Sequence, residues 1–304
     1  MEKLENCPVC NYEKWEIFLH CRDHFQSGDE FEIVRCKKCS FLFTNPRPDR
    51  NEIGKYYESQ NYISHHSSGN DLMSIVYRLV RKWNIKKKFI IISTLSNGKN
   101  LLDIGCGSGE LLQYFNSHGW NTMGIEPNNT ARKIAVEQNN VNAFPEGQLE
   151  EMPDASFDVI SLWHVLEHIS DLHKRMAEIR RLIKPGGTIF IAVPNASSYD
   201  AKYYNSFWAA FDVPRHLYHF TRETISLLVS NYQFEMIKIL PMKMDAFYVS
   251  LLSEKYKTGR KNIIKAVTIG LKSNIDSRRK INHSSLIYVL RPAKQILPGL
   301  DSPK

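Results

Sequence analysis

The sequence lacks any uninterrupted apolar run that approaches the roughly 20 residues a membrane-spanning helix requires. Its longest candidate, IIKAVTIGL, is too short and lies among lysines and arginines. The first residues, MEKLENCPVCNYEKW, also lack the apolar core of a secretory signal. These two absences argue against a spanning segment and against export, so we expect a cytoplasmic protein.

Cysteine is scarce as well, with six residues in a chain of 304. Four of them form two pairs of identical spacing, CPVC and CKKC, at Cys7, Cys10, Cys36 and Cys39. In a cytoplasmic protein this pattern indicates a metal site before it indicates disulfides. Two such pairs place four thiolates around a tetrahedral Zn²⁺, with iron as the less common alternative. A closed set of four cysteines leaves no open position, so we predict a structural zinc.

Negative charge is nearly absent from the last 50 residues. The whole chain carries a net charge of +8, but residues 255–304 alone hold 12 basic and 2 acidic side chains. A basic segment of this kind favours phosphate-bearing partners, RNA or an anionic membrane surface. A simple solvated basic surface is an equally good interpretation.

Strand-like and helix-like segments alternate from residue 100 onward. The apolar runs NLLDIG, NTMGIEP, FDVISLWHV and GGTIFIAVPN are separated by segments of helical spacing. Such alternation predicts a parallel sheet with right-handed crossovers, and continuous apolarity predicts helices on both of its faces. We therefore expect an α/β fold with a Rossmann-like, mostly parallel sheet of seven strands, preceded by a small zinc-ribbon module.

The order of these features divides the chain into five expected parts. They are a zinc ribbon at 1–48, a connector and long helix at 49–98, a core at 99–240 and 283–292, a basic helical insertion at 241–282, and a tail at 293–304.

A glycine-rich loop in LLDIGCGSGELL joins the first core strand to a helix. Gly105, Gly107 and Gly109 let the backbone adopt positive φ and approach a ligand closely. The dinucleotide pattern G-x-G-x-x-G fails here, because a glutamate takes the place of its last glycine. Asp103 precedes the loop and Glu126 ends the next strand, so two acids border it. This arrangement suits a positively charged ligand with an unphosphorylated ribose, as in S-adenosylmethionine.

Several blocks of the sequence resemble the motifs of the class I methyltransferases. LLDIGCGSG, GIEP, GQLEEMPDASFDVISLWHVLEHI and RRLIKPGGTIFIAVPN follow one another in the family's order over residues 99–240. The resemblance implies that Asp103 orders the ammonium of S-adenosylmethionine, that Glu126 binds its ribose hydroxyls, and that the donor meets the acceptor near the end of the fourth strand. It assigns cofactor contacts to Asp103, Gly105, Gly107, Gly109, Glu126, Gln148, Leu149 and Trp163.

Two absences restrict the methyl acceptor. No NPPY-like tetrapeptide follows the fourth strand, which argues against the adenine and glutamine amino-methyltransferases, and no cysteine suits covalent cytosine chemistry. A hydroxyl or acidic-carbon acceptor requires a base. His216, in DVPRHLYHF, is our first choice for that base. The other predicted catalytic side chains are His164, Tyr62 and Tyr57.

Three functions follow from these observations. A zinc ribbon, paired tyrosines and a methyltransferase core together resemble the sugar C-methyltransferases, which predicts a small-molecule acceptor such as a sugar or another metabolite. A zinc-bearing N-terminus before a class I core also resembles the bacterial 23S rRNA guanine methyltransferases, with the basic C-terminal region contacting RNA. The third hypothesis is a binding scaffold without catalysis. The sequence does not specify an oligomeric state.

Overall fold

The computed structural model describes residues 1–57, 72–277 and 281–293. Its largest element is a seven-stranded sheet in the order β10-β11-β8-β7-β4-β5-β6. Five neighbouring strands run parallel, and β11 is antiparallel to both of its neighbours. The strands are β4 (Asn100–Ile104), β5 (Asn121–Ile125), β6 (Ala143–Phe144), β7 (Phe157–Trp163), β8 (Ile183–Pro194), β10 (Phe234–Pro241) and β11 (Ser285–Pro292).

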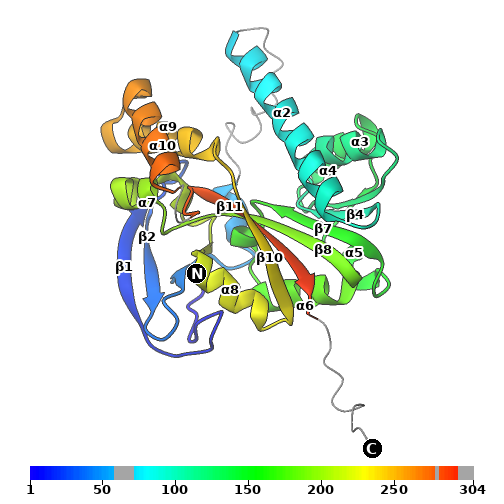
Figure 1. The fold of residues 1–304 in the computed structure, drawn as a ribbon. Helices are drawn as coiled ribbons and strands as arrows, with labels where there is room; N and C mark the ends of the chain where they lie inside the picture. The colour runs from blue at the N-terminus through cyan, green and yellow to red at the C-terminus, as the bar shows by residue number, and fades with distance from the viewer. Residues whose placement is uncertain (58–71, 278–280, 294–304) are drawn as a thin grey trace, which may run out of the picture.

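Helices cover both faces of this sheet (Figure 1). On one face lie α3 and α4, with the long α2 beside them, and on the other lie α6 and α8. The arrangement confirms the predicted Rossmann-like fold. The helices are α2 (Leu72–Leu95), α3 (Glu110–Asn116), α4 (Asn129–Glu137), α5 (Gln148–Glu151), α6 (Leu172–Leu182) and α8 (Arg222–Ser230).

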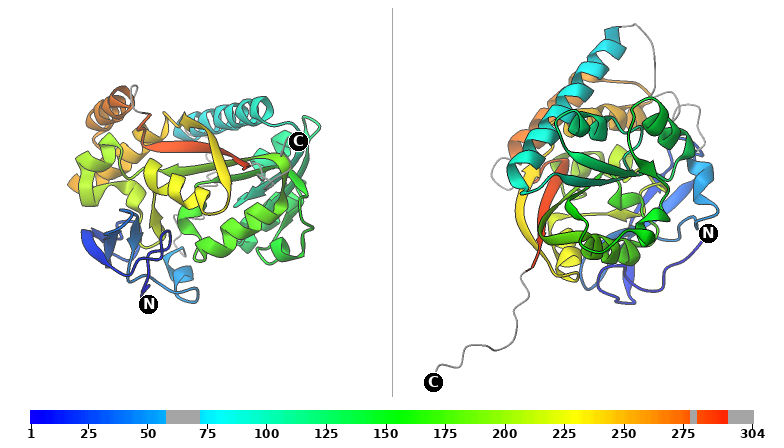
Figure 2. Two further views of the ribbon diagram at one scale, coloured as in Figure 1. Left: turned by 60° about the horizontal axis from the view of Figure 1, so that its bottom comes forward. Right: turned by 90° about the vertical axis from the view of Figure 1, so that its right-hand side faces the viewer.

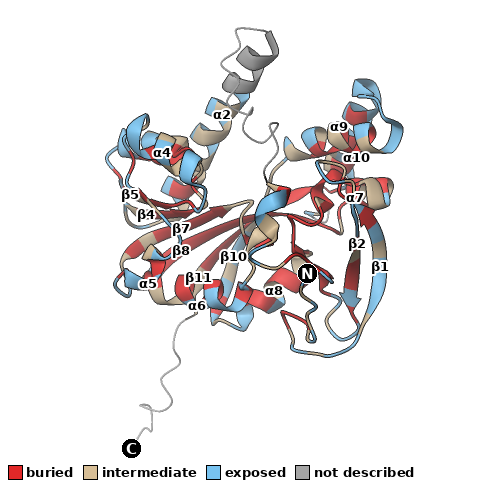
Figure 3. Ribbon diagram, turned by 180° about the vertical axis from the view of Figure 1, so that it is seen from behind, coloured by how far each residue is buried: buried red, intermediate tan, exposed pale blue. Residues whose placement is uncertain are grey.

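The central strands are buried along almost their whole length (Figure 3). Every residue from 187 to 194 of β8 is buried, as is every residue from 285 to 290 of β11. Burial on both sides of the pleat explains why these strands read as continuous rather than alternating apolar runs. Helix α8 begins at Arg222, because the Thr221 side chain accepts a hydrogen bond from the Thr224 N–H and so caps its first turn.

A second, four-stranded sheet forms the N-terminal part of the molecule. Its order is β1-β2-β3-β9, with β1 (Trp15–Arg22), β2 (Glu30–Cys36) and β3 (Leu42–Thr44) following the chain. The fourth strand, β9 (Tyr218–His219), comes from the segment after β8 and pairs with β3. No sequence pattern predicts this pairing, because two residues are too few to show a strand periodicity.

The N-terminal sheet and the large sheet share one hydrophobic core. Phe41 and Phe43, at strand β3 of the N-terminal sheet, belong to the same buried cluster as Leu217. That cluster also contains Leu102 and Ile160 from strands of the large sheet. The first 48 residues are therefore attached to the rest of the molecule through side chains as well as through the chain itself.

The helices α7 (Tyr199–Tyr204), α9 (Asp245–Thr258) and α10 (Ile263–Asp276) lie together beside the end of β11 (Figure 2). Four short 3₁₀ segments complete the described elements: η1 (Ile53–Tyr56), η3 (Leu166–His168), η4 (Asn205–Phe207) and η5 (Ala209–Phe211). Within the described ranges, no helix combines the length and the apolarity needed to cross a bilayer.

Candidate functional site

The candidate site lies where the chain reverses direction across the large sheet. After β4 the chain adds β5 and β6 on one side, and then returns to place β7 on the other. In open α/β sheets the loops diverge at such a point and leave a crevice beyond the strand ends. Asp103 of β4 is buried here and accepts a 2.5 Å hydrogen bond from Ser161 Oγ of β7. Burial raises the pKa of Asp103 to about 6, although Ser161 and the nearby Lys88 favour its charged form.

The three glycines of the predicted loop all have positive φ, between 56° and 78°. A Cβ at Gly105 would lie 2.3 Å from the Val165 side chain, and one at Gly109 would lie 3.0 Å from Ala135 Cβ. A Cβ at Gly107 would meet nothing within 4 Å. Gly105 and Gly109 are therefore required by packing, whereas Gly107 borders open space that a ligand can fill.

Glu126 follows β5 and folds back onto this loop. Its carboxylate accepts hydrogen bonds of 2.8 Å from the N–H groups of Gly107 and Asn128. It is 8% exposed, and burial raises its pKa despite those two bonds. The structure thus brings Asp103, Glu126 and the glycine loop together, as the sequence predicts.

Gln148 and Leu149 begin the short helix α5 after β6. The Gln148 side chain is partly exposed and donates to Glu151 Oε2 at 2.9 Å. The Leu149 side chain is fully buried in the core, and its carbonyl accepts a 2.7 Å bond from Arg181. Of this pair, only Gln148 offers a side chain to a ligand.

A pocket of about 830 Å³ adjoins the strand ends. Its walls come from α2, from the end of β7, from α9 and the turn before it, and from Phe25 in the β1–β2 connection. Apolar and aromatic side chains form most of the lining, including Trp83, Trp163 and Tyr248. Two predicted residues, His164 and His216, also line it.

Lys88 connects the pocket to the buried acid of β4. Its ammonium lies 4.1 Å from the centre of the Trp163 ring, a cation–π contact. Burial lowers the pKa of Lys88 to about 8, and the carboxylates of Asp103 and Asp245 limit that fall. A cation therefore lies beside the predicted ligand site.

His164 follows β7 in a left-handed conformation with φ of 56°. Its Nδ1 lies 3.3 Å from Glu167 Oε1, and its Nε2 lies 3.1 Å from Asp245 Oδ2. Burial opposes charge on this ring, but the two carboxylates outweigh it and raise the pKa of His164 to about 10. His164 is consequently an imidazolium at neutral pH, which does not fit its predicted use as a base.

His216 is buried, and its Nδ1 lies 2.8 Å from the Ala210 carbonyl oxygen. Its ring packs edge-on against His168, with 4.6 Å between ring centres. His168 Nδ1 in turn lies 3.0 Å from the Tyr57 hydroxyl and 3.0 Å from the Arg215 carbonyl. The structure thus unites His216 and Tyr57 through His168. Tyr62, the remaining predicted residue, lies outside the described residues.

Three residues of this neighbourhood were not among the predicted site residues. Glu167 and His168 lie in η3, where the spacing HVLEH could have indicated them, since it places an acid and a second histidine within one turn of His164. Asp245 is far along the chain, at the start of α9, and no local pattern marks it.

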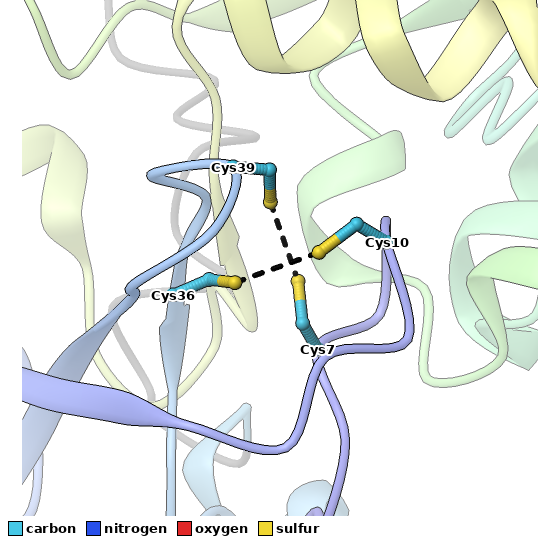
Figure 4. Close-up of side chains that lie close together, drawn as sticks. All are labelled: Cys7, Cys10, Cys36 and Cys39. Carbon is cyan, nitrogen blue, oxygen red and sulfur yellow. Dashed lines mark hydrogen bonds between the residues drawn. The ribbon is translucent and has the colours of Figure 1, made fainter.

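The four paired cysteines converge in the N-terminal module (Figure 4). Cys7 and Cys39 have their Sγ atoms 3.6 Å apart, and Cys10 and Cys36 have theirs 3.5 Å apart. Sulfur atoms of a tetrahedral zinc site with Zn–S bonds of about 2.3 Å would be separated by about 3.8 Å. The donor type and the spacing therefore fit a tetrahedral metal ion.

Comparisons with known proteins agree with this geometry. A family model described as "Methyltransferase domain" matches residues 81–239. Ubiquinone biosynthesis O-methyltransferases are similar: that of Sodalis glossinidius is 35% identical over 105 residues, and one from Pseudomonas aeruginosa is 37% identical over 108. Each match covers 32% of this chain and 42% or 45% of the relative, so the chain spans less than half the length of these curated relatives.

A solved structure shares the fold. Phosphoethanolamine N-methyltransferase 2 of Haemonchus contortus, in complex with S-adenosyl-L-methionine, superimposes with a TM-score of 0.50 at 18% identity. The match covers 92% of this chain and 69% of that chain.

Proposed function

The chain belongs to the methyltransferase-domain family, as its sequence blocks predict, and we propose that it transfers a methyl group from S-adenosylmethionine to a hydroxyl of a small molecule. One observation carries this proposal above the others. Two buried acids, Asp103 and Glu126, flank a glycine loop that leaves open space at Gly107, and Lys88, which interacts with Asp103, lines a mostly apolar pocket.

The residues around the loop fit the donor. The Asp103 carboxylate would pair with the ammonium of the methionine portion, and Glu126 would accept hydrogen bonds from the ribose hydroxyls. Gln148 would contact the adenine, since its amide can both donate and accept. When bound, S-adenosylmethionine supplies a sulfonium methyl that is already activated, so the chain mainly has to position an acceptor.

The lining of the pocket favours the acceptor class. A mostly apolar wall with aromatic rings such as Trp83 and Tyr248 suits an acceptor with an apolar body better than a sugar. The curated relatives are named as O-methyltransferases, which supports a hydroxyl as the methylated group.

His216 is the pocket residue best suited to receive the hydroxyl proton. Its Nδ1–H donates to the Ala210 carbonyl, which leaves the lone pair on Nε2. His164, held as a cation between two carboxylates, would instead orient the acceptor by donating to it.

The two alternatives from the sequence have less support. A pocket walled by α2, α9 and the N-terminal module suits a small molecule more than an RNA strand. A scaffold without catalysis would not need the open space at Gly107 or the Glu126 carboxylate beside it, and this chain has both. Salt-dependent RNA binding would be the sign that the RNA alternative is correct.

A structural Zn²⁺ is part of the same proposal. Cys7, Cys10, Cys36 and Cys39 would hold it with no free coordination position, so it would stabilise the N-terminal module and take no part in methyl transfer.

The direct test is a transfer assay with S-adenosylmethionine carrying a labelled methyl group and a panel of phenols, alcohols, sugars, amines and RNA. We expect label in an ether product of a phenol or alcohol, with one S-adenosylhomocysteine formed per methyl transferred. His216→Ala should reduce turnover while leaving donor binding unchanged. Labelling of an amine or of RNA alone would refute the hydroxyl acceptor.

A further inference from the structure

Three side chains converge on one point beside the pocket, and one of them, His216, lines it. A carboxylate oxygen of Glu167 and one ring nitrogen each of His168 and His216 all lie within 4.8 Å of one another. Two of these residues come from η3, and the third comes from the segment that leads into β9. The cluster is separate from the cysteine site and from the glycine loop.

Hydrogen bonds on the outer sides of the rings set which nitrogens face the cluster. His216 Nδ1 lies 2.8 Å from the Ala210 carbonyl, and His168 Nδ1 lies 3.0 Å from the Arg215 carbonyl. A carbonyl only accepts, so each Nδ1 carries the hydrogen, and the Tyr57 hydroxyl, 3.0 Å from His168 Nδ1, is then a second acceptor for that hydrogen. The lone pair of each neutral ring is then on Nε2, which is the arrangement of metal-binding histidines.

Glu167 supplies the negative charge of the cluster. Its side chain is fully buried, and neither carboxylate oxygen accepts a hydrogen bond from the described residues. His164 Nδ1 lies 3.3 Å from Glu167 Oε1, and His164 Nε2 lies 3.1 Å from Asp245 Oδ2. A buried carboxylate is costly unless it is paired or bound to a metal.

We propose that Glu167, His168 and His216 bind a catalytic divalent cation beside the acceptor pocket. Two imidazoles and one carboxylate suit borderline ions such as Zn²⁺, Fe²⁺ or Co²⁺ better than Ca²⁺ or Mg²⁺. Three protein ligands leave at least one coordination position open. Because His216 lines the pocket, an acceptor in the pocket would lie next to this cluster.

This inference rests on the proposed function and gives its acceptor a binding group. An acceptor hydroxyl bound to the cation loses its proton to water at neutral pH, because the cation stabilises the oxyanion. The oxygen lone pair then forms the O–CH₃ bond while the S–CH₃ bond breaks, and S-adenosylhomocysteine leaves. One proton is released per methyl transferred. With the cation bound, the Nε2 lone pair of His216 would be held by the metal, so the cation would replace His216 as the group that activates the hydroxyl.

Cobalt provides a probe that separates this site from the cysteine site. The protein is stripped of metal, refolded if necessary, and titrated with Co²⁺ while absorption is recorded. Cobalt in the thiolate site gives intense sulfur-to-metal charge-transfer bands, whereas cobalt bound by histidine and carboxylate gives only weak ligand-field bands. We expect two Co²⁺ per chain, one of each kind.

Variants then assign the second ion to the cluster. One cobalt site should show only weak ligand-field bands. His168→Ala, His216→Ala and Glu167→Gln should lower the Co²⁺ affinity of that site by at least about tenfold. They should leave the thiolate bands unchanged. The matched control is His20→Ala, because the His20 side chain is 65% exposed and lies in the N-terminal sheet, away from the pocket.

The outcomes separate the two proposals. A wild-type chain that takes up one Co²⁺, with thiolate bands only, overturns the metal proposal, as do cluster variants that retain both ions. If a variant fails to fold, the wild-type stoichiometry decides alone. A chain that binds the second ion at the cluster but transfers no methyl group keeps this site and loses the proposed function.

Discussion

Thr44, at the end of the N-terminal sheet, donates a 2.9 Å hydrogen bond from Oγ1 to the main-chain carbonyl of His216 at the pocket. The Thr44 N–H also donates a 3.0 Å hydrogen bond to the carbonyl of Leu217, the residue after His216. The N-terminal module therefore supports the segment that carries the pocket histidine, as well as folding around its own cysteines.

This connection changes what metal removal should do. We predict that removal of a cysteine-bound ion by a chelator raises amide hydrogen exchange in β1, β2 and β3 and also at residues 217–219, because β3 is the strand with which β9 pairs in the described part of the chain. Helices α3 and α4 should keep their protection and serve as the internal control. If exchange rises in the first 48 residues alone, the module is independent of the pocket.

Two glycines of the loop should respond differently to the same substitution. Gly105→Ala should unfold the loop or lower the melting temperature strongly, because its Cβ would meet the Val165 side chain at 2.3 Å. Gly107→Ala should lower the free energy of unfolding by only about 1–2 kcal/mol, which is the cost of placing an alanine in the left-handed backbone conformation. It should nevertheless weaken S-adenosylmethionine binding, because its methyl group enters the open space. Thermal melts and calorimetry on both variants test this contrast, and equal donor binding by Gly107→Ala would contradict it.

Glu126→Ala should lose donor affinity by about tenfold to a hundredfold, the value of one or two hydrogen bonds to a charged group. Circular dichroism should show that the fold persists. A suitable control is Glu137→Ala on α4, whose side chain is 60% exposed. Unchanged donor affinity in Glu126→Ala would show that this carboxylate does not bind the ribose.

The pH dependence of stability follows from the buried acid of β4. The pKa of Asp103 rises from 3.8 to about 6 in the folded chain, chiefly through burial, with Glu126 adding to the rise and Lys88 and Ser161 opposing it. Protonated Asp103 therefore contributes to the stability of the folded chain. This contribution is fully present below pH 3.8 and is lost as the pH rises through about 6. At pH 7 the ionised Asp103 therefore destabilises the free protein.

We accordingly predict that Asp103→Asn stabilises the free protein at pH 7 and weakens donor binding. The amide oxygen can still accept from Ser161, but it cannot pair with the donor's ammonium. Donor affinity of the wild type should also fall below about pH 6, and this fall should be smaller in Asp103→Asn. Melting curves and calorimetry between pH 5 and 8 measure both effects. A variant that melts earlier at pH 7 would contradict the assignment.

The sequence predicted those parts of the molecule that depend on local pattern. The alternating strands, the glycine loop and the two cysteine pairs all carry short-range signals, and the structure places Asp103, Glu126 and the four cysteines as expected. The pairing of β3 with β9, by contrast, joins residues more than 170 positions apart through two residues. No local pattern encodes such a contact.

The same distinction explains the histidines. HVLEH marks a cluster of ionisable groups, but their states depend on remote partners. The pKa of His164 is raised by Glu167 nearby in the chain and by Asp245, at the start of α9, which lies 3.1 Å away. His216 and His168 have defined tautomers because carbonyls of Ala210 and Arg215 accept their hydrogens. Residue type alone could therefore name the candidates but could not assign their roles.

The central claim is that the loop between β4 and α3, with its two acids, binds a positively charged adenosyl donor. Isothermal titration of the purified chain with S-adenosylmethionine tests it most directly. We predict one binding site per chain, with NADH giving no heat under the same conditions. Binding of NADH, or no binding of S-adenosylmethionine at millimolar concentration, would contradict the account.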